Sequence, residues 1–536
     1  MSELKLSELE AIVGGTLTVP AGARAIAFGA EQAAPCETAR VGRVVIDSRA
    51  VERGDVFWAL PGTRTDGANF AVDAYGRGAA GVVAARDIHR VPQGRWALRV
   101  GNSQQALEQL ASWRRDRFDG RVIAVTGSVG KTTTRQMIET VLGHELQGVG
   151  TQGNQNNRLG LPLSMQRLER GLDFGVFEIG ASEPGAIAHL AALCRPQIGV
   201  ITRVAEAHLQ GFGGQAGVAD AKTELLDTLG PHGIAVLGGD CSWLRRSSER
   251  FGGRKVWFGR GADCDVCATQ VRAHGGLLSF RVDGQSFSVP VWGRHHLVPA
   301  LAAVAVGREF GLSLAAMAAA LADFEPIAWR CDVRHVGDLI VINDAYNACP
   351  TAMRAALELL RDFDAAGRRV VVCGDMAELG DKSVDFHRRL GDEVVTVCGA
   401  DLLVACGQHA AEVAAGARAA GMPARRVITG NSTTEAWDAL RRRLEPGDIV
   451  LFKASRRAAF EQLVEVISNY GECLASKSRA YGSRKLEPAA RRNQSTSGSV
   501  MSVEVAGPRH DPPSWVEALS SSESAVTGST APTSAL

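Results

Sequence analysis

The chain has 536 residues, of which 45% are hydrophobic and 22% are charged, so it can bury several cores and wholesale disorder is excluded. Its 59 Lys and Arg against 58 Asp and Glu give a formal net charge of +1, which excludes a strongly basic surface for nucleic acid or anionic lipid. Eleven cysteines without a repeating framework favour a reducing compartment. No signal-like segment opens the sequence, and no run of about 18 uncharged apolar residues interrupts it, so we expect a cytoplasmic protein without membrane insertion.

The texture of the sequence divides the chain into three globular α/β domains and a tail. Residues 1–110 predict a small mixed domain, because short strand-like runs lie among glycine-rich turns. Residues 111–324 and 325–472 each alternate strand-like and helix-like segments, which predicts a central P-loop-like domain and a C-terminal Rossmann-like domain. Residues 473–536 lose apolar periodicity and are rich in Ser, Gly, Pro and Ala, so we expect a disordered tail. The basic residues that open this tail are interpreted as a solvated linker rather than an anchor for nucleic acid or membrane.

Buried strands are expected wherever a short apolar run lacks polar alternation. In chain order these runs are 43–46, 56–60, 80–84, 122–126, 174–178, 198–202, 339–342, 369–373, 402–405 and 448–452.

A glycine-rich loop follows the expected strand 122–126 and opens a helix. Gly127 and Gly130 allow backbone N–H groups to close around a polyphosphate, Lys131 supplies a positive charge, and the Thr132 hydroxyl can bind Mg²⁺. The usual pattern has a further glycine five positions before the Gly-Lys pair, where this chain has Val125, and no N-K-x-D motif is present. Ordinary GTPases and kinases are therefore disfavoured. The expected ATP-binding loop comprises Gly127, Ser128, Val129, Gly130, Lys131, Thr132 and Thr133.

This shortened loop resembles that of the Mur ligase family, ATP-dependent enzymes that add amino acids to the peptidoglycan precursor. The resemblance covers about residues 4–469, and further blocks follow in the family's order. They are Asp47-Ser-Arg49, Gly153-Asn-Gln-Asn-Asn157, Glu178-Ile-Gly-Ala181, Glu206-Ala-His208, Ala221-Lys-Thr-Glu224, Asp344-Ala-Tyr-Asn347, Gly374-Asp-Met-Ala-Glu-Leu-Gly380 and Lys453-Ala-Ser-Arg456.

The third-domain blocks are similar to those of the MurF branch. That branch implies an ADP-forming ligase that joins D-alanyl-D-alanine to UDP-N-acetylmuramoyl-tripeptide through an acyl phosphate, in peptidoglycan precursor synthesis. The D-N-P-R selector typical of the neighbouring branch is not visible. Two alternatives stay open: a related ligase with a different amino-acid substrate, and a non-catalytic homologue that binds the nucleotide precursor. The third residue of the tripeptide, diaminopimelate or lysine, is also open. We expect no nucleic-acid partner and a monomer.

The resemblance implies a role for each matching residue. It makes Lys131, Glu178, His208 and Lys222 the catalytic set, with ATP and Mg²⁺ as cofactors. The metal ligands would be Thr132, Glu178, His208 and Lys222, the last as a carbamate. The remaining nucleotide contacts would be Arg330, Asp344, Tyr346 and Asn347. The substrate contacts would be Ser48, Arg49, Asn154, Asn156, Asn157, Lys453, Ser455 and Arg456.

The chain also departs from the family's pattern. His296 and Pro299 replace two asparagines in the block 293–303, on the expected adenine side, and Cys349 replaces another. Arg203 replaces an asparagine and Ala454 a glycine. No expected metal ligand and no phosphate-loop lysine is lost, so activity is expected to be retained. The pair Cys264 and Cys267 has zinc-like spacing but no second pair at a suitable distance, and is interpreted as structural.

Overall fold

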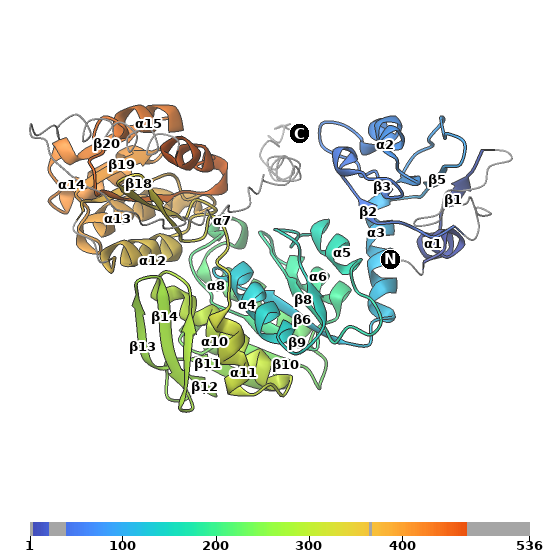
Figure 1. Ribbon diagram of the computed structural model, residues 1–536, viewed down its shortest axis with the longest axis horizontal. Coiled ribbons are helices and arrows are strands. Elements are labelled where there is room, and N and C mark those ends of the chain that lie inside the picture. The colour runs from blue at the N-terminus through green and yellow to red at the C-terminus, as the bar shows by residue number, and fades with distance from the viewer. Residues whose placement is uncertain (1–3, 21–38, 364–366, 469–536) are drawn as a thin grey trace, which may run out of the picture. The chain divides into compact units, whose positions relative to one another are not determined.

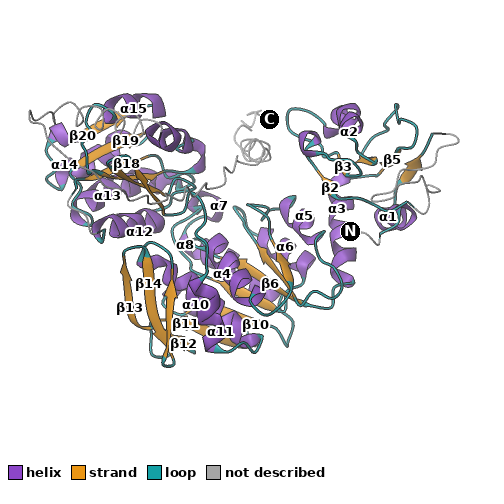
Figure 2. Ribbon diagram, in the orientation of Figure 1, coloured by secondary structure: helices purple, strands orange, loops and turns teal. Residues whose placement is uncertain are grey.

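The computed structural model describes residues 4–20, 39–363 and 367–468. The described chain forms two compact units, one up to Ala106 and one from Leu107 onward. Figures 1 and 2 show the helices and strands of each unit. The expected tail, 473–536, lies outside the described residues. Within the described part, no helix combines the length and the apolar character needed to cross a membrane.

The first unit contains a five-stranded sheet with the order β1-β5-β4-β3-β2. Strands β2 to β5 are parallel, and β1 runs antiparallel to β5. The helices α1 (Leu6–Val13) and α2 (Ala71–Arg77) accompany the sheet, and Phe57, Ala74 and Val82 belong to its core. The prediction of a mixed α/β fold is confirmed here. The strands are β1 (Thr16–Thr18), β2 (Val44–Val45), β3 (Val56–Trp58), β4 (Gly81–Ala84) and β5 (Trp96–Arg99).

The second unit begins with a seven-stranded, all-parallel sheet in the order β12-β11-β10-β9-β6-β8-β7. Along β6, Val122 and Ala124 join one hydrophobic core while Ile123 and Val125 join another. Helices therefore cover both faces, which explains why this strand reads as a continuous apolar run. The strands are β6 (Arg121–Thr126), β7 (Gly148–Gly150), β8 (Phe174–Glu178), β9 (Ile198–Ile201), β10 (Ile234–Gly238), β11 (Arg254–Gly259) and β12 (Val266–Cys267).

The expected strands 122–126, 174–178 and 198–202 correspond to β6, β8 and β9. The helices of this part are α3 (Ser103–Asp116), α4 (Lys131–Gly143), α5 (Gly160–Met165), α6 (Ala186–Cys194), α7 (Leu209–Phe212), α8 (Gln215–Asp227), α9 (Ser242–Ser247), α10 (Leu297–Glu309) and α11 (Leu314–Ala322).

A separate three-stranded antiparallel sheet follows, formed by β13 (Thr269–His274), β14 (Leu277–Val282) and β15 (Gln285–Val289). The sequence pattern predicts continued α/β alternation over 111–324, and this sheet departs from that prediction. Leu278, Phe280 and Val282 alternate with more exposed residues along β14 and pack into a core shared with α10 and α11. This period of two is the signal that could have revealed the sheet.

The last part of the second unit is a six-stranded sheet with the order β16-β17-β21-β18-β19-β20, in which only β16 is antiparallel to its neighbour. The four strands expected here correspond to β17, β18, β19 and β21. The strands are β16 (Asp332–Val336), β17 (Leu339–Asn343), β18 (Arg369–Cys373), β19 (Leu402–Cys406), β20 (Val427–Gly430) and β21 (Ile449–Lys453). The helices are α12 (Pro350–Arg361), α13 (Ser383–Thr396), α14 (Ala410–Ala419) and α15 (Thr433–Leu440).

Candidate active site

The phosphate loop connects the end of β6 to the start of α4. Gly127 and Gly130 have φ of 143° and 79°, in the region that side chains disfavour. A Cβ at Gly127 would lie 2.0 Å from Thr202 Oγ1. Lys131 Nζ donates to the Gly127 carbonyl at 3.0 Å, and burial lowers the pKa of Lys131 while Glu178 opposes that change. The loop thus forms a tight turn with a lysine folded back over it, as the sequence pattern predicts.

The residues after β9 fasten this loop from the side. Ser128 donates its backbone N–H to the Arg203 carbonyl at 2.8 Å, and its hydroxyl accepts from the Ala205 N–H at 3.0 Å. The Thr202 hydroxyl donates to the Val129 carbonyl at 2.7 Å. Arg203, one of the departures from the family's pattern, makes its contact to the loop through its backbone. The turn geometry therefore does not depend on the asparagine that is missing there.

Glu178 ends β8 and is buried, with 1% of its surface exposed. Its Oε1 accepts from Asn156 Nδ2 at 2.7 Å, whereas its Oε2 is buried without a hydrogen-bond partner among the described residues. The same Asn156 amide donates to Asn154 Oδ1 at 2.9 Å. Asn157 instead accepts from the backbone of Leu159 and Gly160 at the start of α5. Because a buried carboxylate oxygen without a partner is costly, this oxygen is suited to a cation.

Lys222 lies on α8 and is 1% exposed. Burial, together with the positive charge of Lys131, lowers the pKa of its amine to about 7. Its Nζ lies 3.4 Å from the Ala181 carbonyl and 5.3 Å from the Phe212 ring centroid. Glu224 accepts from the N–H groups of Gly185 and Ala188 at the start of α6. Lys222 is therefore a buried lysine, and the Glu224 carboxylate is held by the start of α6.

His208 precedes α7 and has a φ of 55°. Its Nδ1 contacts the carboxylate of Glu378, which lies in the 374–380 block, and this contact lowers the pKa of Glu378. Gln210 N–H also donates to the Glu378 carbonyl at 3.1 Å. Glu378 is not among the residues expected at the site from the sequence, although it lies in the matching block 374–380. A carboxylate beside an expected metal-binding imidazole orients the ring, so Glu378 belongs to the site.

Residues from the last part of the chain also reach the phosphate loop. Arg330 Nη2 donates to Thr132 Oγ1 at 2.9 Å, and the Arg330 guanidinium lies 4.1 Å from the Tyr346 ring centroid. Burial raises the pKa of Tyr346, which keeps its hydroxyl protonated. Thr351 donates to the carboxylate of Glu206 at 2.7 Å. The structure thus brings Arg330 and Tyr346 to the loop, although 198 positions separate Arg330 from Thr132.

Lys453, at the end of β21, is buried, and its amine already binds residues of the same domain. Its Nζ lies 2.6 Å from Asp344 Oδ2 and donates to the Asn347 carbonyl at 2.9 Å, so it holds the 344–347 segment in place. Ser455 accepts from the Ala377 N–H at 2.8 Å, and the Arg456 guanidinium lies 5.0 Å from the Trp329 ring centroid. The expected contacts of these three residues with a substrate stay predictions.

Ser48 and Arg49 belong to the first unit. Ser48 is buried in a short 3₁₀ helix, and Arg49 forms an ion pair with Asp47 at 2.9 Å. Asp47 also accepts from the Arg49 backbone N–H at 3.0 Å, so the turn is ordered locally. The expected contacts of Ser48 and Arg49 with the UDP-sugar stay predictions.

Comparisons with known proteins agree along most of the chain. Three family models match: the Mur ligase family, catalytic domain at residues 40–113, the Mur ligase middle domain at 125–307, and the Mur ligase, glutamate ligase domain at 329–456. The UDP-N-acetylmuramoyl-tripeptide–D-alanyl-D-alanine ligase of Bacillus subtilis is 33% identical over 79% of this chain and 92% of its own length. The enzyme of that name from Escherichia coli is 34% identical over 80% of this chain and 94% of its own.

Solved structures agree with this result. MurF from Acinetobacter baumannii is 29% identical, with a TM-score of 0.75 over 87% of this chain and 98% of that chain. MurF ligase from Thermotoga maritima, in complex with ADP, is 30% identical, with a TM-score of 0.69 over 81% of this chain and 99% of that chain. The α/β architecture of several sheets is therefore that of the three-domain MurF structures.

Proposed function

We infer, because the chain belongs to the Mur ligase family, that it is an ADP-forming ligase that joins D-alanyl-D-alanine to UDP-N-acetylmuramoyl-tripeptide in peptidoglycan precursor synthesis. Relatives named for this reaction are 33–34% identical over about four fifths of the chain. The MurF structure solved with ADP agrees with use of ATP. The observation that carries the inference is the convergence of charges at the loop. Arg330 donates to Thr132 directly after the loop, Lys131 donates back to the Gly127 carbonyl, and the charge of Glu178 raises the pKa of Lys131 while that of Arg330 lowers it.

The reaction needs this arrangement because a carboxylate does not react with an amine at an appreciable rate. The terminal carboxylate of the tripeptide attacks the γ-phosphorus of ATP, and the bond to ADP breaks, which leaves an acyl phosphate. The amine of the dipeptide then attacks the acyl carbon, inorganic phosphate leaves, and the amine loses a proton. Lys131 and the loop N–H groups are suited to hold the phosphates in the first step, and Arg330 lies where it can offset their charge.

We further propose Mg²⁺ at Glu178, with Thr132, His208 and Lys222 as the other ligands. The unpartnered Oε2 of Glu178 supports this site, because a hard cation prefers carboxylate oxygen. The ion would supply charge neutralisation between nucleotide and carboxylate. Glu378, bound to Nδ1 of His208, leaves the other ring nitrogen for a ligand.

Carbamylation of Lys222 is the third part of the proposal. Only a neutral amine attacks CO₂, and a lysine whose pKa is about 7 is substantially neutral at physiological pH. The new bond joins Nζ to the carbon of CO₂, and the released proton passes to solvent. The product places an anionic oxygen donor near Lys131, so it also removes the repulsion that a protonated Lys222 would exert on the Lys131 ammonium group.

The substrate contacts are proposed from their positions in the matching blocks. Ser48 and Arg49 would hold the UDP-sugar, Asn154, Asn156 and Asn157 the peptide near the loop, and Lys453, Ser455 and Arg456 the dipeptide. We propose that the enzyme works in the cytoplasm, where ATP is supplied. A nucleic-acid partner forms no part of the proposal, and the expected monomer stays a prediction.

A paired-substrate assay tests this function. Phosphate release from ATP should require both UDP-N-acetylmuramoyl-tripeptide and D-alanyl-D-alanine. Lys131→Met should abolish it, because the variant lacks the positive charge that offsets the phosphates. Release with other amino acids in place of the dipeptide would identify a related ligase. Binding of Mg-ATP without turnover would identify a non-catalytic homologue and overturn the proposal. A panel that varies the third residue of the tripeptide decides between diaminopimelate and lysine.

A further inference from the structure

Three side chains that bind transition metals meet beside the candidate active site. His295 and His296 lie directly before α10, and Cys331 lies directly before β16. One ligand atom from each of the three lies within 4.8 Å of the others. His295 Nε2 is 3.4 Å from Cys331 Sγ, and the two imidazole rings have centroids 4.3 Å apart. In a tetrahedral zinc site, bond lengths of about 2.1 Å to nitrogen and 2.3 Å to sulfur place those two atoms about 3.6 Å apart, close to the distance seen here.

Hydrogen bonds among the three side chains do not account for all of their buried polar atoms, which favours a bound metal. An S–H···N bond explains the contact between Cys331 and His295, but the Nδ1 atom of His296 is buried with no hydrogen-bond partner among the described residues. His296 is 6% exposed and Cys331 is 5% exposed.

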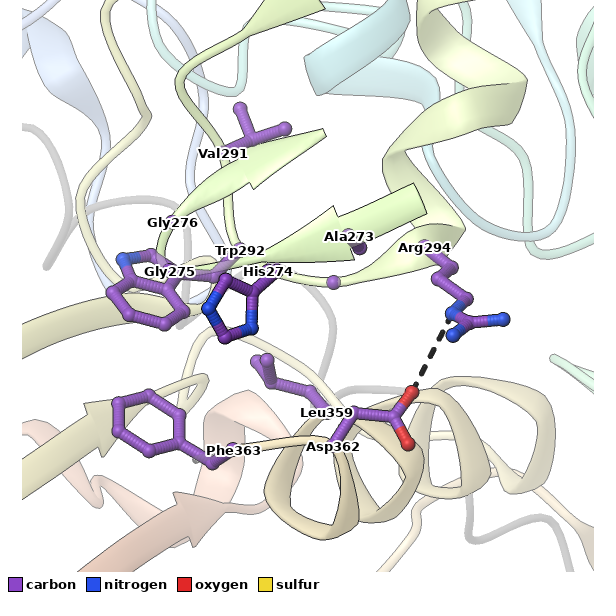
Figure 3. Close-up of a pocket in the computed structure, with 11 residues that line it drawn as sticks. Ala273, His274, Gly275, Gly276, Val291, Trp292, Arg294, Leu359, Asp362 and Phe363 are labelled. Carbon is purple, nitrogen blue, oxygen red and sulfur yellow. Dashed lines mark ion pairs between the residues drawn. The ribbon is translucent and has the colours of Figure 1, made fainter. Parts of the chain in front are cut away.

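The segment that carries the two histidines is held in place by its neighbours. Trp292 stacks on Phe363 with ring centroids 4.7 Å apart, and Arg294 forms an ion pair with Asp362 at 3.5 Å. These four side chains line a cavity of about 140 Å³ between the β13–β14 turn and α12 (Figure 3). These two contacts hold the backbone directly before His295 and His296, which reduces the ordering that metal binding requires.

The carboxylate of Asp344, which contacts the Cys331 backbone, is already engaged. Asp344 Oδ1 accepts from the Cys331 N–H at 3.3 Å, and its Oδ2 pairs with Lys453 at 2.6 Å. The described residues therefore bring together three ligands, two imidazoles and one thiol. A cation bound there would keep one position for water, the arrangement of a three-ligand zinc site.

We propose that His295, His296 and Cys331 form a binding site for a borderline-soft divalent cation such as Zn²⁺. On binding, the Cys331 thiol loses its proton to solvent and a metal–sulfur bond forms. The site is distinct from the proposed Mg²⁺ site, whose character is set by the Glu178 oxygen. Because Arg330 directly precedes Cys331 and donates to Thr132, an ion at Cys331 also fixes the arginine that contacts the phosphate loop.

Cobalt is the probe that reports on this ligand set directly. The full-length protein, prepared without a polyhistidine tag and stripped of metal with a chelator, is titrated with Co²⁺ in the absence of nucleotide. We expect one equivalent to produce a thiolate-to-cobalt charge-transfer band together with the visible bands of tetrahedral cobalt, and we expect Zn²⁺ to displace both. Since no nucleotide or substrate is present, failure of this experiment leaves the proposed ligase function untouched.

Variants assign the band to these residues. Cys331→Ser should abolish the charge-transfer band, and His296→Asn should weaken cobalt binding at least tenfold while the thiolate stays in place. Cys267→Ser, in the other pair with zinc-like spacing, is the matched control and should leave the titration unchanged. Circular dichroism checks that each variant is folded, and His296→Asn decides the question if Cys331→Ser is not. Absence of the band, its survival in Cys331→Ser, or its loss in Cys267→Ser would each overturn the proposal.

Discussion

At the scale of single residues, the buried amine of Lys222 has the lowered pKa on which the proposed carbamylation depends. An ammonium group among Phe212, the Ala181 carbonyl and a second lysine has little to offset its charge, and the pKa falls to about 7 for that reason. The chain therefore holds a neutral nucleophile where a metal ligand is proposed. Helix propensity on α8 does not reveal this, because the pKa depends on what surrounds the side chain.

Carbamylation at Lys222 should be visible by carbon-13 NMR. Protein equilibrated with ¹³C-bicarbonate should show one carbamate signal that Lys222→Arg removes, since arginine does not form the adduct. The neutral amine becomes more abundant as the pH rises through about 7, so the signal should grow between about pH 6 and about pH 8. An identical signal in Lys222→Arg would assign the adduct to another amine and contradict the prediction.

Asn156 is the residue that positions Glu178. Asn156→Ala removes the donor to Glu178 Oε1, so the carboxylate loses its orientation and a bound cation loses affinity. We expect the Mg²⁺ concentration for half-maximal turnover to rise about 10-fold to 100-fold. The exposed Asn431→Ala is the control and should leave that concentration unchanged. Equal Mg²⁺ requirements in the two variants would show that Asn156 has no positioning role.

At the scale of elements, the turn between β6 and α4 requires a residue without a side chain at position 127. Gly127 combines a φ of 143° with a close approach to Thr202, and both conditions exclude a Cβ. The strand before the turn is buried on both faces, so it cannot shift to make room. The loop geometry is thus enforced by the neighbouring strand β9 as well as by its own sequence.

Gly127→Ala should cost about 1–3 kcal/mol of folding free energy through backbone strain and reduce turnover about 10²-fold by displacing the phosphate-binding groups. The matched control is Gly143→Ala at the end of α4, where a Cβ would meet no atom within 4 Å. Alanine is the better helix former, so this variant should be as stable or up to about 1 kcal/mol more stable. Denaturant unfolding and steady-state assays measure both effects. Equal behaviour of the two variants would contradict the role assigned to Gly127.

At the scale of the whole molecule, each of the two units has its own hydrophobic core. The core described for the first unit draws on residues 45–91, and the cores of the second unit draw on residues 111–467. The phosphate loop, Glu178, His208, Lys222 and Arg330 all belong to the second unit, whereas Ser48 and Arg49 belong to the first. The boundaries expected at 110, 324 and 472 stay predictions.

Calorimetry with ligands should distinguish the units. We expect Mg-ADP to bind the folded phosphate loop and so to raise the unfolding temperature of the second unit. Ligand at 100 times its Kd stabilises the folded state by about 2.7 kcal/mol. UDP-N-acetylmuramoyl-tripeptide should raise the unfolding temperature of the first unit. Lys131→Met should remove the effect of Mg-ADP and keep the effect of the UDP-sugar. A shift of both units by Mg-ADP alone would contradict the separate assignment of the two ligands.

The sequence by itself determined the α/β class, the main parallel strands, the phosphate loop and the family. Each of these leaves a local mark, such as the apolar run 122–126 or the spacing of Gly127, Gly130 and Lys131, because it depends on residues that are neighbours in the chain. Only the tertiary structure decided the burial of Lys222, the pairing of His208 with Glu378 and the meeting of His295, His296 and Cys331. Those features arise from contacts between residues up to 170 positions apart, and burial and pKa depend on such contacts rather than on local pattern.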